Sequence, residues 1–104
     1  RLKTMNRFLQ LLGLATRAGR TVSGEFSVEQ SVKKGRVCLV IVAADASDNT
    51  KKHFKDMCAY RGIPVIFKCS RELLGRSLGK QDRASVGILE KGFADKLISI
   101  VQEG

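Results

Sequence analysis

The stretch VCLVIVAA, residues 37–44, decides the fold of this 104-residue chain. It is a run of eight apolar residues, rich in β-branched side chains, with no polar residue interrupting it. A strand without polar alternation is covered on both faces, so the run predicts a central strand, with parallel pairing. Such a strand needs a layer of helices on each side of its sheet.

Two helices are predicted before this strand. Apolar residues recur at helical spacing over residues 4–18, and Gly19 ends that pattern. Residues 21–22 form at most a short strand. A second helix opens at Ser23-Gly24 and continues to Lys34 before Gly35, with Ser23 as its N-cap and Gly35 as its stop.

Helices and strands also alternate after the apolar run. A polar turn at residues 45–49 leads into a helix that ends at 62–64, and residues 65–67 form a short strand. Ser70 caps a brief helix around residues 72–74. A buried strand over residues 84–89 and a closing helix carrying Phe93, Leu97, Ile98 and Val101 complete the chain. This order predicts an α/β fold, a three-layer α/β/α sandwich around a small sheet.

The length predicts a single domain spanning residues 1–104. Met5 is a candidate natural start, which would make residues 1–4 an upstream extension or an expression remnant. No apolar run approaches the ~20 residues that cross a bilayer, and no signal-peptide pattern is present, so no membrane partner is expected. The three cysteines form no close pair, which favours reduced thiols and a cytoplasmic protein, with Cys38 as a small buried hydrophobe.

The charge of the chain indicates a polyanionic partner. Nineteen Lys and Arg against ten Asp and Glu give a net charge of +9. Unbalanced charge repels itself and destabilises the compact state, so RNA or DNA is the expected counterpart. No acidic residue occurs in the first 24 positions, which hold five basic ones: Arg1, Lys3, Arg7, Arg17 and Arg20.

A glycine-bracketed basic loop, LGRSLGK at residues 74–80, is the sharpest local candidate for a nucleic-acid contact. Its glycines allow positive φ and close backbone approach, while Arg76, Lys80 and Arg83 offer charge to phosphates. The alternative is a plain turn with solubilising cations. A phosphate-binding P-loop is excluded, because the glycine spacing is one residue short and no Ser or Thr follows the lysine.

Two lysine clusters are further candidates. Lys33 and Lys34 stand at a helix end, where cations complement the helix dipole. Lys51 and Lys52, with Lys55, occupy the opening turns of a helix, where the dipole disfavours cations. Their presence there predicts contact with an anion.

Catalysis has little support in the sequence. The single histidine, His53, has no partners that would make a Ser-His-Asp or Cys-His arrangement. No ligand-type residues show zinc spacing, so neither an enzyme nor a metal site is expected.

The pattern resembles the ribosomal protein L-seven-Ae superfamily of RNA binders, and is closest to its bacterial YlxQ-type branch. The resemblance covers residues 8–101 and is carried by these segments: Leu11-Leu12-Gly13-Leu14-Ala15 with Arg17, Ser23-Gly24-Glu25, Leu39-Val40-Ile41-Val42-Ala43 with Asp45, Leu74-Gly75-Arg76-Ser77-Leu78-Gly79, and Gly92-Phe93-Ala94-Asp95-Lys96-Leu97-Ile98-Ser99.

The resemblance implies a mixed four-stranded sheet, no cofactor, no enzymatic activity, and structured RNA as the ligand, typically a kink-turn or a related bent internal loop. It also implies ribosomal RNA and the ribosome as partners. In the family, the start of the second helix and the glycine-bracketed loop grip the bend. Together with the basic clusters, the candidate RNA contacts are Gly24, Glu25, Phe26, Ser27, Gln30, Lys33, Lys34, Lys51, Lys52, Leu74, Gly75, Arg76, Ser77, Gly79, Lys80 and Arg83.

The chain departs from the family pattern at the start of the second helix. Strong kink-turn binders carry Asn-Glu and then Lys where this chain has Phe26-Ser27 and Gln30. Asn and Glu read purine edges by directed hydrogen bonds, whereas a phenyl ring could stack on an unpaired base. Two alternative functions are a protein–protein adaptor for an acidic partner and a small-ligand α/β enzyme, which would need a titratable cluster in a cleft.

Overall fold

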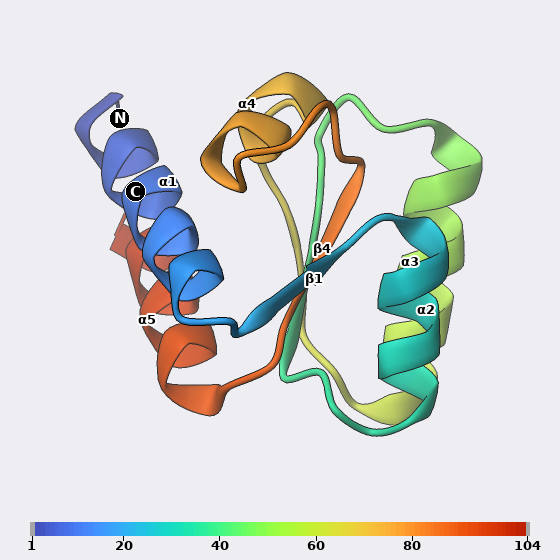
Figure 1. Cartoon of the computed structure of the whole chain (residues 1–104). Helices are drawn as coiled ribbons and strands as arrows, with labels where there is room; N and C mark the ends of the chain where they lie inside the picture. The colour runs from blue at the N-terminus through green and yellow to red at the C-terminus, as the bar shows by residue number, and fades with distance from the viewer. Residues whose placement is uncertain (1, 104) are drawn as a thin grey trace.

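The computed structural model describes residues 2–103, so Arg1 of the basic N-terminal set and the outermost ends of the predicted domain lie outside the described residues. Helices and strands alternate along the chain, as Figure 1 shows. The elements are α1 (Leu2–Arg17), β1 (Thr21–Ser23), α2 (Glu25–Lys33), β2 (Leu39–Val42), α3 (Asp48–Arg61), β3 (Val65–Phe67), α4 (Arg71–Ser77), β4 (Ser85–Ile88) and α5 (Lys91–Glu103).

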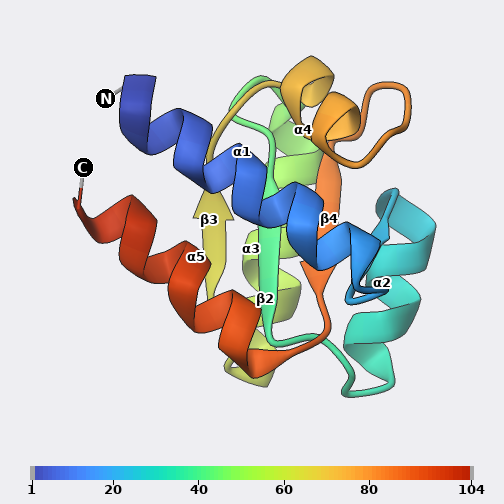
Figure 2. The ribbon, with the colours of Figure 1, turned by 60° about the vertical axis from the view of Figure 1, so that its left-hand side comes forward.

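The sheet has four strands in the order β1-β4-β2-β3. Strand β2 is central, and all four of its residues are fully buried, as the apolar run predicted. Its pairing is parallel with β3 but antiparallel with β4, so the predicted parallel pairing holds on one side only. The reason lies in the connection from β3 to β4. Its short helix α4 lies at the end of the sheet where β3 ends (Figure 2), so β4 starts from that end and runs in the opposite direction.

The helices form a layer on each face of the sheet. Helices α1 and α5 pack together on one face, and α2 and α3 cover the other (Figures 1 and 2). Phe8, Leu12 and Leu97 fill the core on the first side, and Val28, Val32 and Phe54 fill it on the second. The three-layer α/β/α sandwich around a mixed four-stranded sheet is therefore confirmed.

Two local expectations need correction. Helix α1 runs from Leu2 to Arg17, whereas the predicted helix covered residues 4–18. Cys38 is half-buried rather than buried, whereas Cys58 and Cys69 are buried. Burial raises the pKa of both the Cys58 and the Cys69 thiol to about 11, which keeps them protonated at neutral pH. Over residues 2–103, no helix is long and apolar enough to cross a membrane.

Candidate nucleic-acid interface

Two segments distant in sequence meet at one edge of the sheet. The backbone N–H of Gly24 donates to the carbonyl oxygen of Ser85 at 3.1 Å, and Nε of Arg83 donates to the hydroxyl of Ser23 at the same distance. These bonds join the start of α2 to the segment that leads from α4 into β4. The structure therefore brings together the two regions that the family resemblance paired.

The residue that precedes α2 as its N-cap is Gly24 and not Ser23. Gly24 is the N-cap, with φ +92°, and no side chain caps the helix. Ser23 cannot serve as the cap because its backbone belongs to β1, opposite Val86, and its hydroxyl accepts from Arg83. The first backbone N–H groups of α2 have no partner within the helix, and the helix dipole adds positive potential there, so this end attracts anions.

The side chains at this helix start are exposed, and the carboxylate of Glu25 is the one charge in its first turn. The ring of Phe26 is 75% exposed, although large apolar side chains are usually covered. Glu25 and Ser27 are also exposed, and Gln30 is half-buried on the next turn. The site thus offers an open aromatic surface beside backbone donors.

A groove of about 300 Å³ lies beside this helix start, and we call it the β1–α4 groove. None of its lining residues is acidic, and Lys80 and Arg83 supply two positive charges. It is lined by Thr16, Thr21, Val22, Ser23, Ser27, Leu78, Lys80 and Arg83. The sequence prediction included Ser27, Lys80 and Arg83 and missed the others, because a Thr at a helix end or in a short strand has no distinctive signal.

The predicted glycine-bracketed loop is mostly helix. Residues 74–77 are the last turn of α4, and only the residues after them form a turn. The two glycines have different roles. A Cβ at Gly75 would lie 2.0 Å from the carbonyl oxygen of Gln81, so Gly75 permits the returning chain to pack on the helix. Gly79 has φ +71° and permits the turn itself.

The charged residues of this region differ in the hydrogen bonds and ion pairs that they already make within the protein. Arg83 is half-buried and also donates from Nη1 to the carbonyl of Asp82 at 3.0 Å, so its guanidinium chiefly holds the groove together. Lys80 is exposed and makes no ion pair among the described residues. Arg76 pairs with Glu72 at 2.9 Å and lies, with Ser77, on the side of α4 that faces α1. Lys80 is therefore the cation best placed for an anion in the β1–α4 groove.

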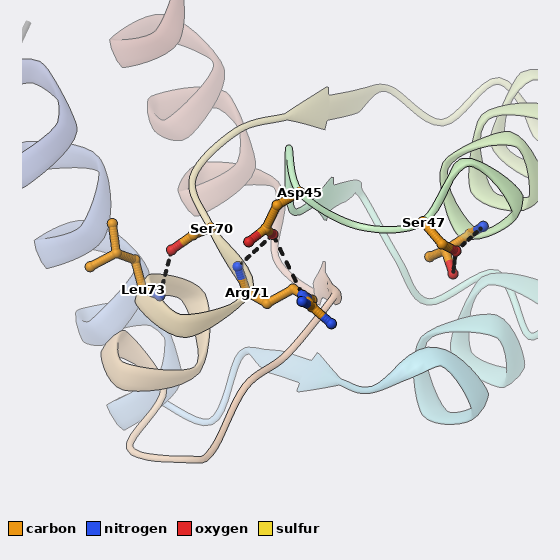
Figure 3. A network of polar contacts seen from close by, with 6 residues as sticks. Asp45, Ser47, Ser70, Arg71 and Leu73 are labelled. Atoms are coloured by element: carbon orange, nitrogen blue, oxygen red, sulfur yellow. Dashed lines mark hydrogen bonds and ion pairs between the residues drawn. The ribbon is translucent and has the colours of Figure 1, made fainter.

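Helix α4 is fixed in place by caps and by the end of β2, as Figure 3 shows. The hydroxyl of Ser70 accepts from the backbone N–H of Leu73 at 3.1 Å, which confirms Ser70 as the N-cap. A carboxylate oxygen of Asp45 accepts from the N–H of Arg71 at 2.9 Å and lies 3.7 Å from its Nε. Asp45 thereby ties the start of α4 to the loop that follows the central strand.

The lysine clusters lie elsewhere. Lys33 and Lys34 are at the opposite end of α2 from Gly24 (Figure 1), and Lys33 pairs with Glu29 at 2.9 Å. Hydrogen bonds from Lys33 and then from His53 hold the pKa of Glu29 below its usual value. The structure does not bring Lys33 or Lys34 to the β1–α4 groove, because α2 separates them from it along its whole length.

Lys51 and Lys52 lie at the start of α3, which Ser47 caps by accepting from the N–H of Thr50 at 3.1 Å. They face the end of β3 and not the β1–α4 groove. Lys52 pairs with Asp56 at 2.7 Å, and that hydrogen bond lowers the pKa of Asp56. The pairing partly neutralises the cluster, which the sequence pattern did not reveal.

In the part of the chain that the structure describes, no group of three or more His, Cys, Asp or Glu side chains gathers in a way that could hold an ion. The chemical resources of the interface are instead cations, backbone donors and an exposed aromatic ring, which suit a phosphate-bearing ligand.

Comparison with known proteins adds independent information. The sequence model of the ribosomal protein L7Ae/L30e/S12e/Gadd45 family matches residues 6–98. The RNA-binding protein YlxQ of Bacillus subtilis (strain 168) is 46% identical over 91 residues, which cover 88% of this chain and 91% of that protein. The RNA-binding protein YlxQ of Enterococcus faecium is 36% identical over 102 residues, covering 98% and 94%.

Solved structures give the same fold. A Bacillus halodurans protein of unknown function superposes with a TM-score of 0.89 at 41% identity, over 91% of this chain and 96% of that one. The Giardia lamblia 15.5kD RNA binding protein superposes with a TM-score of 0.79 at 24% identity, over 97% and 87%. At that identity the second likeness speaks for the fold alone.

Proposed function

The chain belongs to the ribosomal protein L7Ae/L30e/S12e/Gadd45 family, and on this premise we propose that it is a non-enzymatic, ribosome-associated protein that binds structured RNA. The observation that carries the proposal is the junction of the α2 start with the end of α4. Hydrogen bonds from Gly24 and Arg83 hold it, and the lining of the β1–α4 groove beside it includes Lys80 and Arg83 and no carboxylate. Two relatives named as RNA-binding proteins support it.

The proposed contacts divide by chemistry. The unpaired N–H groups at the start of α2 and the ammonium of Lys80 bind phosphates, which position the RNA without reading its sequence. The exposed ring of Phe26 stacks on an unpaired base, as aromatic side chains do in single-stranded RNA recognition. A bend or internal loop is the RNA feature that presents a phosphate backbone and a splayed base together.

Specificity for a standard kink-turn is expected to be low. Ser27 and Gln30 occupy positions where strong kink-turn binders place charged residues, and Phe26 cannot donate a hydrogen bond to a base edge. Changing Phe26→Asn, Ser27→Glu and Gln30→Lys together should sharpen discrimination against a kink-turn lacking its sheared purine pairs by ~1–3 kcal/mol. A wild-type preference of a hundredfold for the intact kink-turn would show that Phe26 reads the bend in another way.

The proposal is tested by titrating total ribosomal RNA and a kink-turn RNA over a range of salt concentrations. Each phosphate that the protein neutralises should contribute ~0.7–0.9 to the slope of log affinity against log salt. Lys80→Gln should weaken binding and reduce the magnitude of the slope by the contribution of about one phosphate. Arg61→Gln, the same charge change at the far end of α3, should do neither. An affinity that does not change with salt concentration, or no binding to either RNA, refutes the proposal.

Ribosome association has a separate test. Cell extract is sedimented through sucrose in low-magnesium and high-magnesium buffer, and the protein is followed by antibody. Comigration with a ribosomal subunit that is lost in the Lys80→Gln variant supports the proposal. If the protein sediments only with free protein, ribosome association is refuted. The RNA titration then decides by itself whether the protein binds structured RNA.

A further inference from the structure

A second groove, of about 380 Å³, lies between α1 and α4, and we call it the α1–α4 groove. The two helices contact each other along this side of the molecule (Figure 2). Its polar lining comes from Gln10 and Arg17 of α1 and from Arg76 and Ser77 of α4, and half-buried Leu9 and Leu73 supply its apolar part. Apolar walls with a few convergent polar groups are typical of small-molecule sites of this size.

Gly13 makes the geometry of this groove possible. It is buried, and a Cβ there would lie 3.2 Å from the carbonyl oxygen of Ser77 and 3.5 Å from Nη1 of Arg17. The backbones of α1 and α4 therefore approach closely at this point. The guanidinium of Arg17 folds back along its helix over Gly13, so this exposed positive charge lies at the wall of the groove.

The residues that line the groove carry two positive charges and no carboxylate, and Arg17 makes no ion pair among residues 2–103. Arg76 pairs with Glu72, but both side chains are highly exposed, and such surface pairs are weak enough for the guanidinium to turn to a stronger anion. Two guanidiniums from two helices suit a phosphate, which arginine binds in bidentate fashion.

The remaining lining suits a base. Leu9 and Leu73 can cover the face of a base, while the Gln10 amide and the Ser77 hydroxyl can hydrogen-bond its edge. The groove also adjoins the β1–α4 groove, because Thr16 and Arg17 are neighbours on α1 and Ser77 and Leu78 are neighbours at the end of α4. A chain of nucleotides can thus pass from one groove to the other around the end of α4.

We propose that the α1–α4 groove binds one unpaired nucleotide of the RNA held at the β1–α4 groove. The phosphate lies between Arg17 and Arg76, and the base lies against Leu9 and Leu73. This inference rests on the proposed RNA-binding function and extends it, since it adds a site on the opposite side of α4 and gives a role to Arg17 and Gln10.

The test uses the full chain labelled with ¹⁵N and follows the side-chain signals of Gln10 and Arg17 by NMR. Single-stranded pentauridylate and pentaadenylate are the probes, with uridine and adenosine monophosphate and a pentaglutamate peptide as separate arms. Both pentanucleotides should shift these signals. Arg17→Gln should weaken pentanucleotide affinity about tenfold, as expected for one lost charged hydrogen bond, and Gln10→Ala should weaken it less. Arg61→Gln is the control of equal charge change and should have no effect.

The outcomes separate the alternatives. Pentanucleotides that shift neither signal, or an affinity unchanged in Arg17→Gln, overturn the proposal. Monophosphates that bind as tightly as the pentanucleotides overturn its RNA part and make this a free-nucleotide site. Equal binding of pentaglutamate refutes nucleotide recognition and points to an acidic protein. If these arms fail while wild-type protein still binds ribosomal RNA with a steep salt slope, only the α1–α4 groove is refuted and the proposed function stands.

Discussion

Gly75→Ala should destabilise the protein even though it replaces glycine by the best helix former within a helix. Helix propensity alone would stabilise α4 by about 1 kcal/mol. The new Cβ, however, would lie 2.0 Å from the carbonyl oxygen and 2.6 Å from the carbonyl carbon of Gln81, and 3.0 Å from Cα of Asp82. These are backbone atoms, so no side-chain rotation relieves the clash.

The size of the effect follows from the displacement required. Ordinary contact begins at 3.4 Å, so the backbone at Gln81 must retreat by 3.4 − 2.0 = 1.4 Å. That movement strains the bond from the N–H of Lys80 to the carbonyl of Gly75, at 2.8 Å, and the bond from Arg83 to Ser23. Overpacking of this kind costs up to ~3 kcal/mol, which leaves a net loss of about 2 kcal/mol after the gain in propensity.

Thermal and urea unfolding followed by circular dichroism measure this loss. For a domain of this length the melting temperature should fall by about 8–16 °C. Gly92→Ala in α5 is the matched control, because the atoms that its Cβ would meet at 3.1–3.5 Å form the carboxylate end of the Glu90 side chain, which accepts from the N–H of Phe93 and needs to move only a few tenths of an ångström. A Gly75→Ala protein as stable as the Gly92→Ala protein would refute the packing argument. RNA affinity should fall with Gly75→Ala as well, since the displaced segment carries Lys80 and Arg83.

Three further predictions concern the core, the α3 lysines and pH. Ile41→Ala or Val40→Ala should cost about 1–5 kcal/mol of unfolding free energy in urea titrations, depending on how far the fully buried site collapses. Lys51→Ala and Lys52→Ala should leave the melting temperature unchanged or slightly raised, because the helix dipole disfavours both cations and the exposed pair with Asp56 contributes little; a clear fall would contradict this. The pKa of Glu29 is held below its ordinary value of 4.5 by hydrogen bonds from Lys33 and His53, so its stabilising effect is present above that value and lost as pH falls through the lower folded-state pKa. Glu29→Gln should therefore lower the melting temperature at neutral pH and reduce its decline on acidification, and parallel pH curves for the two proteins would argue against this assignment.

The sequence by itself determined the layers of the fold. The unbroken apolar run at residues 37–44 predicted a central covered strand, and the alternation of helical and strand patterns placed it in an α/β/α sandwich. The N-cap at Ser70 was also readable, because a side-chain oxygen that accepts from a backbone N–H a few residues ahead is a local interaction. Elements of this kind depend on residues that are close together in the chain.

Local patterns failed where a distant segment competes for the same group. Ser23 has the chemistry of an N-cap, but pairing with β4 and the bond from Arg83 take both its backbone and its hydroxyl. The glycines of residues 74–80 suggested a loop, yet Gly75 lies within a helix. A glycine is needed there because the chain returns across the helix at Gln81 and leaves no room for a Cβ. No signal near either residue reveals these partners.

The candidate interface shows the same division. Composition and the basic clusters identified a protein suited to a polyanion, since net charge is a property of the sequence. Only the tertiary structure decided which cations stand together. Lys80 and Arg83 share a groove with the start of α2, Arg17 and Arg76 line the α1–α4 groove, and Lys33 and Lys52 are paired with carboxylates. Charge is counted along the chain, but the electrostatic potential that a ligand meets depends on distances in space, which folding alone sets.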